Sequence, residues 1–393
     1  CEGLVGSEMC IRDRFNVKIV QANQIIENGD LIIENGVITD VIETFGTPSG
    51  LSVFPGFVDM HGDMIEHELE PRPNVDFPME VAIGHLDARL AAAGVTTAYA
   101  GVSFSRSAID GERRSFEHTS KIIRALKSSI NGLRVDHRIH ARFDMTYTNA
   151  IAALEGLLET NTVDLVSVME HTPGKGQYRD IEKLIAYRMH GSSASEKEVR
   201  AGIEAKIAAA LAPKAIAKNL EEISRLCKAH KVAMASHDDD TVEKANQMAD
   251  IGVVIAEFPV TIEAAKIAAD RGLMIAMGAP NAMRGQSYSG NLSARDVYAA
   301  GLLHILAADY HPAAILPAIK ALQGHQPDGL VGAVRLASLN PARALGLTDR
   351  GEIAPEMRAD ICIIDANNRI VTTLSKGEII YTNGTPIPME PKA

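Results

Sequence analysis

The feature of this sequence that most constrains its fold is an alternation of short apolar runs with longer amphipathic stretches between residues 56 and 345. The runs have the length of buried strands, and the stretches between them, such as Glu80–Ala93, Ile216–His230 and Thr261–Arg271, have helical periodicity. We predict eight strands: Phe57–Met60, Thr96–Val102, Arg138–Phe143, Leu165–Met169, Val232–Ser236, Val253–Phe258, Leu273–Met277 and Ile305–Ala308. Eight strands alternating with helices favour an α/β fold closed into a (β/α)8 barrel. An open doubly wound sheet is the alternative, although no Gly-rich nucleotide-binding loop follows the first strand.

Both ends of the chain show a different pattern, in which short strands are separated by turn signals. Asn28-Gly29, Asn35-Gly36 and Asn383-Gly384 are pairs that favour tight hairpin turns between alternating apolar runs. The expected strands are Val17–Ala22, Gly29–Glu34, Val37–Thr44, Ala359–Ile364, Ile370–Ser375 and Glu378–Tyr381. We therefore predict a composite β-sandwich domain from residues 15–55 and 346–393, with the barrel at residues 56–345.

The first 14 residues fit neither domain. The stretch from Glu8 to Arg14 resembles the translation of a transposon adapter used to prepare sequencing libraries, so we expect residues 1–14 to be a non-native leader. Two of the four cysteines then remain, Cys227 and Cys362. Without paired or metal-finger spacing, they are expected to be core thiols of a cytoplasmic protein in a reducing compartment.

The charge and composition exclude several classes of partner. There are 39 Lys and Arg against 50 Asp and Glu, a net charge of −11 without any basic tract. Nucleic-acid binding by phosphate neutralisation is therefore not expected. Aromatic residues make up only 4% of the chain, and there is no Trp, which disfavours base-stacking surfaces. No apolar run reaches the roughly 20 residues that a membrane-spanning helix needs.

Polar residues collect at the carboxyl ends of the predicted strands, where barrel enzymes place their active sites. Five of the eight strands end in histidine or carboxylate, and one more carries His140 and Arg142 on one face. The strand-end residues are Asp59, His61, Asp63, Glu170, His171, His237, Glu257 and Asp309. This convergence predicts a divalent metal site, because imidazole and carboxylate together suit Zn²⁺, Mn²⁺ or Fe²⁺. Such an ion lowers the pKa of its bound water towards about 7, and a neighbouring Asp can take the proton.

At these residues the sequence resembles the amidohydrolase superfamily. The resemblance rests on Pro55–Asp63, on His237 and Asp309 after strands 5 and 8, and on the closing segment from Asn340 to Leu347. Two features depart from the usual pattern. His61-x-Asp63 stands in place of His-x-His, and no lysine ends strand 4, so Glu170 is the natural substitute for a carbamylated lysine.

Further motifs narrow the resemblance to a family of diphosphatases in phosphonate metabolism. They are Pro71-Arg72-Pro73, Met169–Gly174, Ala235–Asp239, Ala256–Pro259, Gly278–Asn281, Ser289-Gly290-Asn291 and Ala308-Asp309-Tyr310. Met64-Ile65-Glu66 replaces an Asn-containing run of that family, which places this chain in a divergent branch. The resemblance implies hydrolysis of a ribosyl 1-phosphonate 5-triphosphate with release of pyrophosphate, a step of phosphonate catabolism in the C–P lyase pathway.

The resemblance also implies roles for individual residues. Asp309 would orient the attacking water and accept its proton, with His237 as the second catalytic residue. One or two divalent ions would be held by ligands from the set His61, Asp63, Glu170, His171, His237, Glu257 and Asp309. The substrate contacts would be Arg72, His140, Arg142, Lys175, Arg284, Ser289 and Asn291.

Other expectations concern partners and neighbouring segments. The substrate is a phosphorylated small molecule, the protein is a homodimer, and it works with other phosphonate-degrading enzymes. Residues 174–200 are an insertion after strand 4 that could cover the barrel mouth as a lid. Asp238, Asp239 and Asp240 are expected to cap the helix after strand 5. Two alternatives remain, a hydrolase or deaminase acting on a C–N or lactone bond and a scaffold without metal.

Overall fold

A computed structural model describes most of the chain, namely residues 10–72, 75–104, 115–146, 150–190, 194–208, 210–287 and 290–387. Packing of the backbone divides the chain into two compact units. The first unit comprises Cys1–Ala98, Ser129–His137 and Ile305–Ala393, and the second comprises Tyr99–Ser128 and Arg138–His304.

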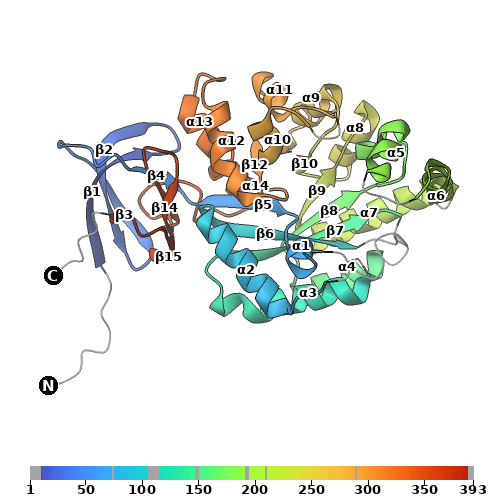
Figure 1. Cartoon of the computed structure of the whole chain (residues 1–393), viewed down its shortest axis with the longest axis horizontal. Coiled ribbons are helices and arrows are strands. Elements are labelled where there is room, and N and C mark those ends of the chain that lie inside the picture. The colour runs from blue at the N-terminus through green and yellow to red at the C-terminus, as the bar shows by residue number, and fades with distance from the viewer. Residues whose placement is uncertain are drawn as a thin grey trace. The chain divides into compact units, whose positions relative to one another are not determined.

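Eight strands form one sheet whose spatial order follows the order of the chain (Figure 1). They are β5 Phe57–Gly62, β6 Val95–Phe104, β7 Asp136–Asp144, β8 Leu165–Met169, β9 Ala233–His237, β10 Ile255–Glu257, β11 Met274–Gly278 and β12 Ile305–Ala307. The pairs from β7 to β11 are parallel. A parallel bridge between Gly62, which ends β5, and Asp309, just after β12, links the first strand to the last. The predicted barrel is confirmed, and the predicted strand bounds differ from the observed ones by no more than two residues.

Helices alternate with these strands, as the apolar periodicity predicts. They are α1 Ile65–Leu69, α2 Met79–Ala92, α3 Phe116–Ser129, α4 Ala150–Glu159, α5 Ile181–Met189, α6 Glu196–Ala208, α7 Pro213–His230, α8 Val242–Asp250, α9 Ile262–Asp270, α10 Ala279–Arg284, α11 Ala294–Ala299, α12 Ile315–Leu322, α13 Gly329–Arg335 and α14 Leu339–Ala344. Among the described helices, four begin at a side-chain cap, in which Asp180, Thr241, Thr261 or Ser293 accepts a backbone N–H of the first turn. Each cap satisfies a donor that the helix itself leaves without a partner.

A second sheet of seven strands lies within the first unit and contains strands from both ends of the chain (Figure 1). Its order is β15-β14-β13-β4-β1-β2-β3. The strands are β1 Cys10–Val20, β2 Ile25–Glu34, β3 Val37–Glu43, β4 Ser52–Pro55, β13 Ile361–Ile364, β14 Ile370–Ser375 and β15 Glu378–Thr382. β4 pairs antiparallel with β13, with Phe54 opposite Cys362. Alternate residues of these strands, such as Ile19, Leu31 and Ile363, are buried in one apolar core.

One predicted turn in this sheet is wrong. Asn28-Gly29 does not end a strand but lies inside β2, and the chain turns earlier, where Gln21 N–H donates to the carbonyl of Gln24 at 3.0 Å. Gly29 is required by close packing instead, since a Cβ there would lie 2.9 Å from the carbonyl oxygen of Ile42. Asn35-Gly36 does form the expected turn, with φ of 52° and 78°.

Ion pairs made by two buried arginines link segments of the first unit. Arg350 donates to Asp136 at 2.5 Å and to the Thr97 hydroxyl at 2.9 Å. Arg358 donates to Asp360 at 2.8 Å. We call Arg350, Arg358, Asp136 and Asp360 the arginine network. Because each guanidinium faces a carboxylate, these charges are compensated where they are buried.

The two remaining cysteines are core thiols, as predicted. Cys227 and Cys362 are both free and buried, and burial raises the pKa of the Cys227 thiol to about 12. The position of Cys362 also accounts for the glycine at position 94. Gly94 has φ of 82°, and a Cβ there would lie 2.7 Å from the Cys362 sulfur.

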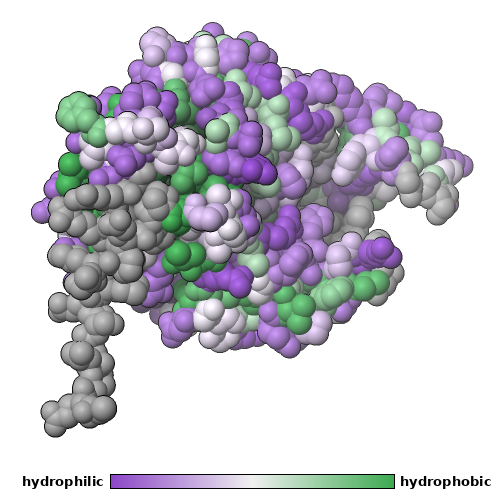
Figure 2. Space-filling model, turned by 60° about the vertical axis from the view of Figure 1, so that its left-hand side comes forward, coloured by the Kyte–Doolittle hydropathy of each residue, from purple (hydrophilic) through white to green (hydrophobic). Residues whose placement is uncertain are grey.

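The surface drawn in Figure 2 is mainly hydrophilic, with apolar residues gathered in small groups between polar ones. Within the described ranges, no helix combines the length and the apolar character needed to cross a bilayer.

Candidate metal centre

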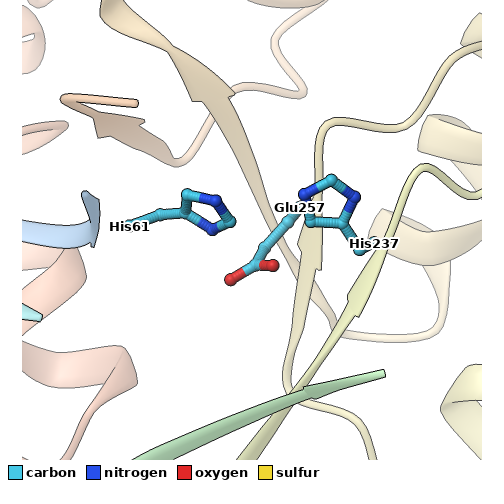
Figure 3. Close-up of side chains that lie close together, drawn as sticks. All are labelled: His61, His237 and Glu257. Atoms are coloured by element: carbon cyan, nitrogen blue, oxygen red, sulfur yellow. The ribbon is translucent and has the colours of Figure 1, made fainter. Parts of the chain in front are cut away.

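The polar interior of the second unit is built on four neighbouring parallel strands, β7 to β10. The register of β7 and β8 places Arg142 beside Ser167. The register of β9 and β10 places His237 beside Glu257, nearer the carboxyl ends of the strands. Figure 3 shows the side chains of His237 and Glu257, which leave these neighbouring strands. Both residues end their strands, so their side chains lie at the edge where a barrel site is expected.

Glu257 is held by a hydrogen-bond chain that crosses three strands. The Ser167 hydroxyl donates to Glu257 Oε2 at 2.8 Å, and His140 Nε2 lies 2.5 Å from the Ser167 oxygen. All three side chains are at least 99% buried. A serine hydroxyl has one proton, so a hydroxyl that donates to Glu257 must accept from His140. The arrangement therefore requires His140 to carry a proton on Nε2.

His237 lies between a cation and an anion. Its Nε2 is 3.1 Å from Arg142 Nη2, and its Nδ1 is 2.9 Å from Asp238 Oδ2. Asp238 has a left-handed backbone, with φ of 55°, which carries the chain away from β9 directly after the histidine. A carboxylate on one ring nitrogen fixes the orientation and tautomer of an imidazole whose other nitrogen can bind a ligand.

A metal-compatible group lies within this unit. His171, His237 and Asp238 each offer one ligand atom, and these atoms all lie within 4.8 Å of one another. Two imidazole nitrogens and a carboxylate oxygen are donors that suit Zn²⁺, Mn²⁺ or Fe²⁺. The residues present therefore fit a divalent ion. His171 also lies 3.5 Å from Asp144, whose carboxylate accepts the hydroxyl of Thr146 at 2.6 Å.

Burial and pairing shift the pKa values around this group. Burial lowers the pKa of His237, against the opposing effect of Asp238. Burial alone would raise the pKa of Asp238, but the neighbouring His237 holds it below its ordinary value. Burial alone would also raise the pKa of Asp144, but His171 and the hydrogen bonds from Thr146 together hold it below its ordinary value. His237 is thus kept neutral and the two aspartates ionised, which are the forms that bind metal.

In the first unit, the predicted residues of β5 and the segment after β12 are joined through the backbone. Asp309 N–H donates to the carbonyl of His61 at 2.9 Å, and Asp63 N–H donates to the carbonyl of Asp309 at 2.8 Å. His61 Nε2 lies 3.4 Å from Asp63 Oδ1. Asp309 has φ of 57°, an uncommon backbone for a residue with a side chain. These bonds hold Asp309 beside His61 and Asp63.

Asp59 is the most deeply buried carboxylate of this segment. Its Oδ1 accepts the N–H of Ala308 at 2.8 Å and that of His61 at 3.1 Å. Burial raises its pKa to about 6. Asp59 therefore ties β5 to the end of β12 beneath His61.

The predicted substrate contacts have different environments. Lys175 donates to Glu170 at 2.6 Å, so these two predicted residues bond to each other. Arg72 and Arg284 are exposed, whereas His140 and Arg142 are buried. Asn291 donates to the carbonyl of Gln177 at 3.5 Å. Ser289 lies outside the described residues.

The predicted helix cap after β9 is wrong. Thr241 caps α8 and accepts the N–H of Lys244, while the three aspartates before it have other partners. Asp238 faces His237, Asp239 faces Lys244 at 3.5 Å, and Asp240 accepts the N–H of Gly176 at 2.9 Å. The left-handed turn at Asp238 delays the helix and directs that side chain back towards the histidine.

Sequence reasoning missed three residues of this centre. Ser167 and Asp144 lie within strands β8 and β7, and Asp238 was assigned to the cap. The signal was present for Asp144, since it ends its strand at the same edge as Glu257. For Ser167 the sequence offers no signal, because only the register of neighbouring strands places its hydroxyl between His140 and Glu257.

Comparison with solved structures identifies the fold. The chain superposes on 5-methylcytosine deaminase from Klebsiella pneumoniae with a TM-score of 0.63 at 14% identity, covering 95% of this chain and 98% of that one. It superposes on N-acetyl-D-glucosamine-6-phosphate deacetylase from Mycobacterium smegmatis with a TM-score of 0.61 at 16% identity, covering 96% and 100%. The chain therefore shares the fold of these two enzymes.

Sequence comparison then identifies the family. No family model matches the chain. It is 36% identical over 360 residues to alpha-D-ribose 1-methylphosphonate 5-triphosphate diphosphatase of Escherichia coli strain K12, a match that covers 88% of this chain and 93% of that protein. The chain belongs to the family of that diphosphatase and is a hydrolase.

Proposed function

We propose that this protein hydrolyses the 5-triphosphate of a ribosyl 1-phosphonate and releases pyrophosphate, as a step in phosphonate catabolism. The observation that carries the proposal is the match over most of both chains to a diphosphatase whose name states that substrate. The buried histidines and carboxylates at the strand ends of this chain supply the donor set that such a hydrolysis needs.

We propose further that His61, His237 and Glu257, the three side chains drawn in Figure 3, each act as a ligand of a divalent ion. Their nitrogen and oxygen donors fit such an ion. The remaining proposed ligands, for this ion or a second one, are Asp63, Glu170, His171 and Asp309. Zn²⁺, Mn²⁺ and Fe²⁺ are the candidate ions. When bound, such an ion supplies a water of lowered pKa and positive charge near the phosphoryl oxygens.

Asp309 is the proposed proton acceptor. Its backbone is fixed on both sides by hydrogen bonds to the segment from His61 to Asp63. A carboxylate held in this way orients an attacking water and takes its proton as the bond to phosphorus forms. The electron pair of the broken P–O bond leaves with pyrophosphate, while the new oxygen stays on the ribose 5-phosphate product. His237 remains oriented by Asp238 throughout.

Cationic side chains are the proposed stabilisers of the leaving pyrophosphate. Lys175 is the nearest candidate in sequence to the proposed ligands, and it bonds to Glu170 at 2.6 Å. Binding of Glu170 to a metal ion would release this ammonium for phosphate oxygens. Arg72 and Arg284 are exposed and able to form paired hydrogen bonds to phosphate. Arg142 and His140 would act from inside the barrel, with Ser289 and Asn291 as polar contacts.

The setting of the reaction is also part of the proposal. The buried, unpaired thiols of Cys227 and Cys362 suit a reducing compartment, and we place the protein in the cytoplasm. We propose that it acts as a homodimer alongside other enzymes of phosphonate degradation.

The proposal is tested by incubating the metal-supplemented protein with alpha-D-ribose 1-methylphosphonate 5-triphosphate and measuring pyrophosphate. A panel of other triphosphates, including ribose 5-triphosphate and ATP, provides the comparison. We expect stoichiometric pyrophosphate from the phosphonate substrate. Protein that binds metal but releases no pyrophosphate from any of these compounds contradicts the proposal. That result would favour a C–N or lactone bond as the target.

A further inference from the structure

A cavity of about 350 Å³ lies in the insertion that follows β8. Its walls come from the short turn Gly176–Tyr178, from α5 and from Asn291. The insertion has a small core of its own, in which Leu184 and Ile185 of α5 pack against Ile203 of α6. This core gives the cavity a wall of defined shape. Of the lining residues, Asn291 alone has a role proposed above.

The cavity is connected to the metal-compatible group by Tyr178. The Tyr178 ring, which lines the cavity, has its centroid 6.1 Å from that of His171, and His171 lies 6.1 Å from His237. Gly176 packs the turn closely on the strand ends, because a Cβ there would lie 3.2 Å from the carbonyl oxygen of Asp238. A molecule bound at the proposed metal centre could therefore extend past Tyr178 into the cavity.

The charge of the cavity is small and comes mainly from Lys183. The facing Asp180 lies 3.9 Å from the ammonium, but its carboxylate also caps α5 by accepting the backbone N–H of Lys183. A Cβ on Gly290 would lie 2.8 Å from Lys183 Nζ, which places the ammonium against the loop that carries Asn291. One lysine and one amide can bind a single negative charge. They are too few for a triphosphate, which requires several cations.

The rest of the wall suits a sugar and a short alkyl group. Leu184 is buried beneath the surface of α5, and Ala186 follows it along the wall. Tyr178 and Tyr187 add aromatic faces that combine apolar area with a hydroxyl. The wall thus combines a lysine with its facing carboxylate, the imidazole of His190, two phenol rings and an apolar floor, and it matches a glycosyl ester of an alkylphosphonate. Such an ester carries one negative charge and one short alkyl group.

We propose that this cavity binds the alkylphosphonate end of the substrate, with Lys183 contacting the phosphonate oxygens and the tyrosine rings packing against the ribose. The inference rests on the proposed function and adds to it the residues that distinguish a ribosyl phosphonate from an unsubstituted ribose. Lys183 is a specificity-determining residue in this account, and the bond that breaks lies at the other end of the substrate.

The test compares two substrates in two variants. Pyrophosphate release is measured with alpha-D-ribose 1-methylphosphonate 5-triphosphate and with ribose 5-triphosphate, which lacks the phosphonate. Lys183→Met should raise KM for the first substrate by about tenfold to a hundredfold, the value of one charge-assisted hydrogen bond, and leave kcat and the second substrate unchanged. Lys197→Met, on the neighbouring helix α6 and away from the cavity lining, is the matched control and should behave as the unmodified protein.

The outcomes separate this inference from the proposed function. Equal kinetics of Lys183→Met and the unmodified protein on both substrates would overturn the inference, as would an equal loss on both. If the unmodified protein releases no pyrophosphate at all, the proposed function fails and the cavity is tested by calorimetry with ribose 1-methylphosphonate. Binding that weakens by the same factor in Lys183→Met supports the cavity, and absence of binding overturns it.

Discussion

Two buried polar clusters of this molecule differ in chemistry. The arginine network of the first unit consists of guanidinium and carboxylate groups, with Arg350 facing Asp136 and Arg358 facing Asp360. The cluster at β7 to β10 in the second unit consists of imidazole, hydroxyl and carboxylate groups, in which His140, Ser167 and Glu257 form one chain. Both are buried, and both join several segments of the chain.

The difference shows how a buried polar cluster can be assigned either a structural role or a catalytic one. Arginine keeps its charge at all relevant pH values, so a guanidinium paired with carboxylates can fix positions but cannot exchange protons. Imidazole and carboxylate groups can change protonation state and bind metal ions. We therefore expect substitutions in the arginine network to change stability alone, and substitutions in the second cluster to change metal binding and activity.

The largest effect is expected for His237→Asn. This change removes the imidazole that Asp238 orients and that offers a ligand atom to the metal-compatible group of the second unit. We expect pyrophosphate release to fall roughly a thousandfold, at the upper end of the cost of losing one electrostatic contact. Bound metal should fall with it, as measured by elemental analysis. An unchanged thermal transition serves as the control for folding, and full activity in this variant would contradict the assignment.

Arg350→Met is expected to have the opposite effect, lowering stability while leaving activity unchanged. It leaves the half-buried Asp136 without its nearest guanidinium, while Arg358 remains 3.4 Å away, so we expect a loss of about 3 kcal/mol, the lower end of the cost of breaking a buried pair. Denaturant unfolding should report this loss in the free energy of unfolding. Activity per folded molecule should stay at the level of the unmodified protein. A loss of kcat without a loss of stability would show that the arginine network takes part in catalysis.

Ser167→Ala should have a moderate effect on metal binding. Loss of the hydroxyl removes the bond that orients Glu257, and such supporting bonds are worth about 10- to 100-fold in metal affinity. Competition with a chelator measures the affinity directly. Ser224→Ala is a matched control, because Ser224 is also buried but its hydroxyl donates to the carbonyl of Ile251 at the end of α8. Equal metal affinity in both variants would place Glu257 outside the centre.

The smallest effect is expected at Asp87, whose role is structural, like that of the arginine network. Its carboxylate accepts the N–H groups of Arg134 and Val135 and lies 3.1 Å from His137 Nε2. Although burial opposes it, the bond to His137 and these backbone bonds hold the pKa of Asp87 below its ordinary value. Asp87→Asn should lower the free energy of unfolding by about 1 to 3 kcal/mol at neutral pH, with activity unchanged.

The loss of stability predicted for Asp87→Asn should depend on pH, and the lowered pKa of Asp87 fixes the direction of that dependence. A carboxyl whose pKa is lowered on folding contributes stability above its unfolded pKa of about 4, and the contribution is lost as pH falls through the folded pKa. The difference between Asp87→Asn and the unmodified protein should therefore be largest near neutral pH and shrink below about pH 4. A difference that grows on acidification would contradict the lowered pKa.

The sequence alone predicted the barrel because its strands are short apolar runs with clear ends. The carboxyl-terminal position of His237 and Glu257 followed from those ends. Residues typical of turns and helix caps predicted the local structure less well. Asn28-Gly29 lies within β2, where packing against Ile42 accounts for the glycine, and a left-handed residue at Asp238 moved the helix start to Thr241.

The remaining features depend on pairings between distant segments. Ser167 is joined to His140, 27 residues away, and to Glu257, 90 residues away. Lys175 and Glu170 were assigned separate roles from the sequence, yet they bond to each other. Side-chain contacts of this kind arise from strand register and loop conformation, which apolar periodicity does not encode.

The central claim, that this hydrolase works through a divalent ion held by strand-end histidines and carboxylates, is tested most directly by removing and restoring metal. The chelated protein is assayed for pyrophosphate release from alpha-D-ribose 1-methylphosphonate 5-triphosphate, then titrated with Zn²⁺, Mn²⁺ or Fe²⁺. We predict that activity disappears while the fold is retained, and that one of these ions restores it as one or two equivalents bind. Undiminished pyrophosphate release from the chelated, metal-free protein would contradict the account.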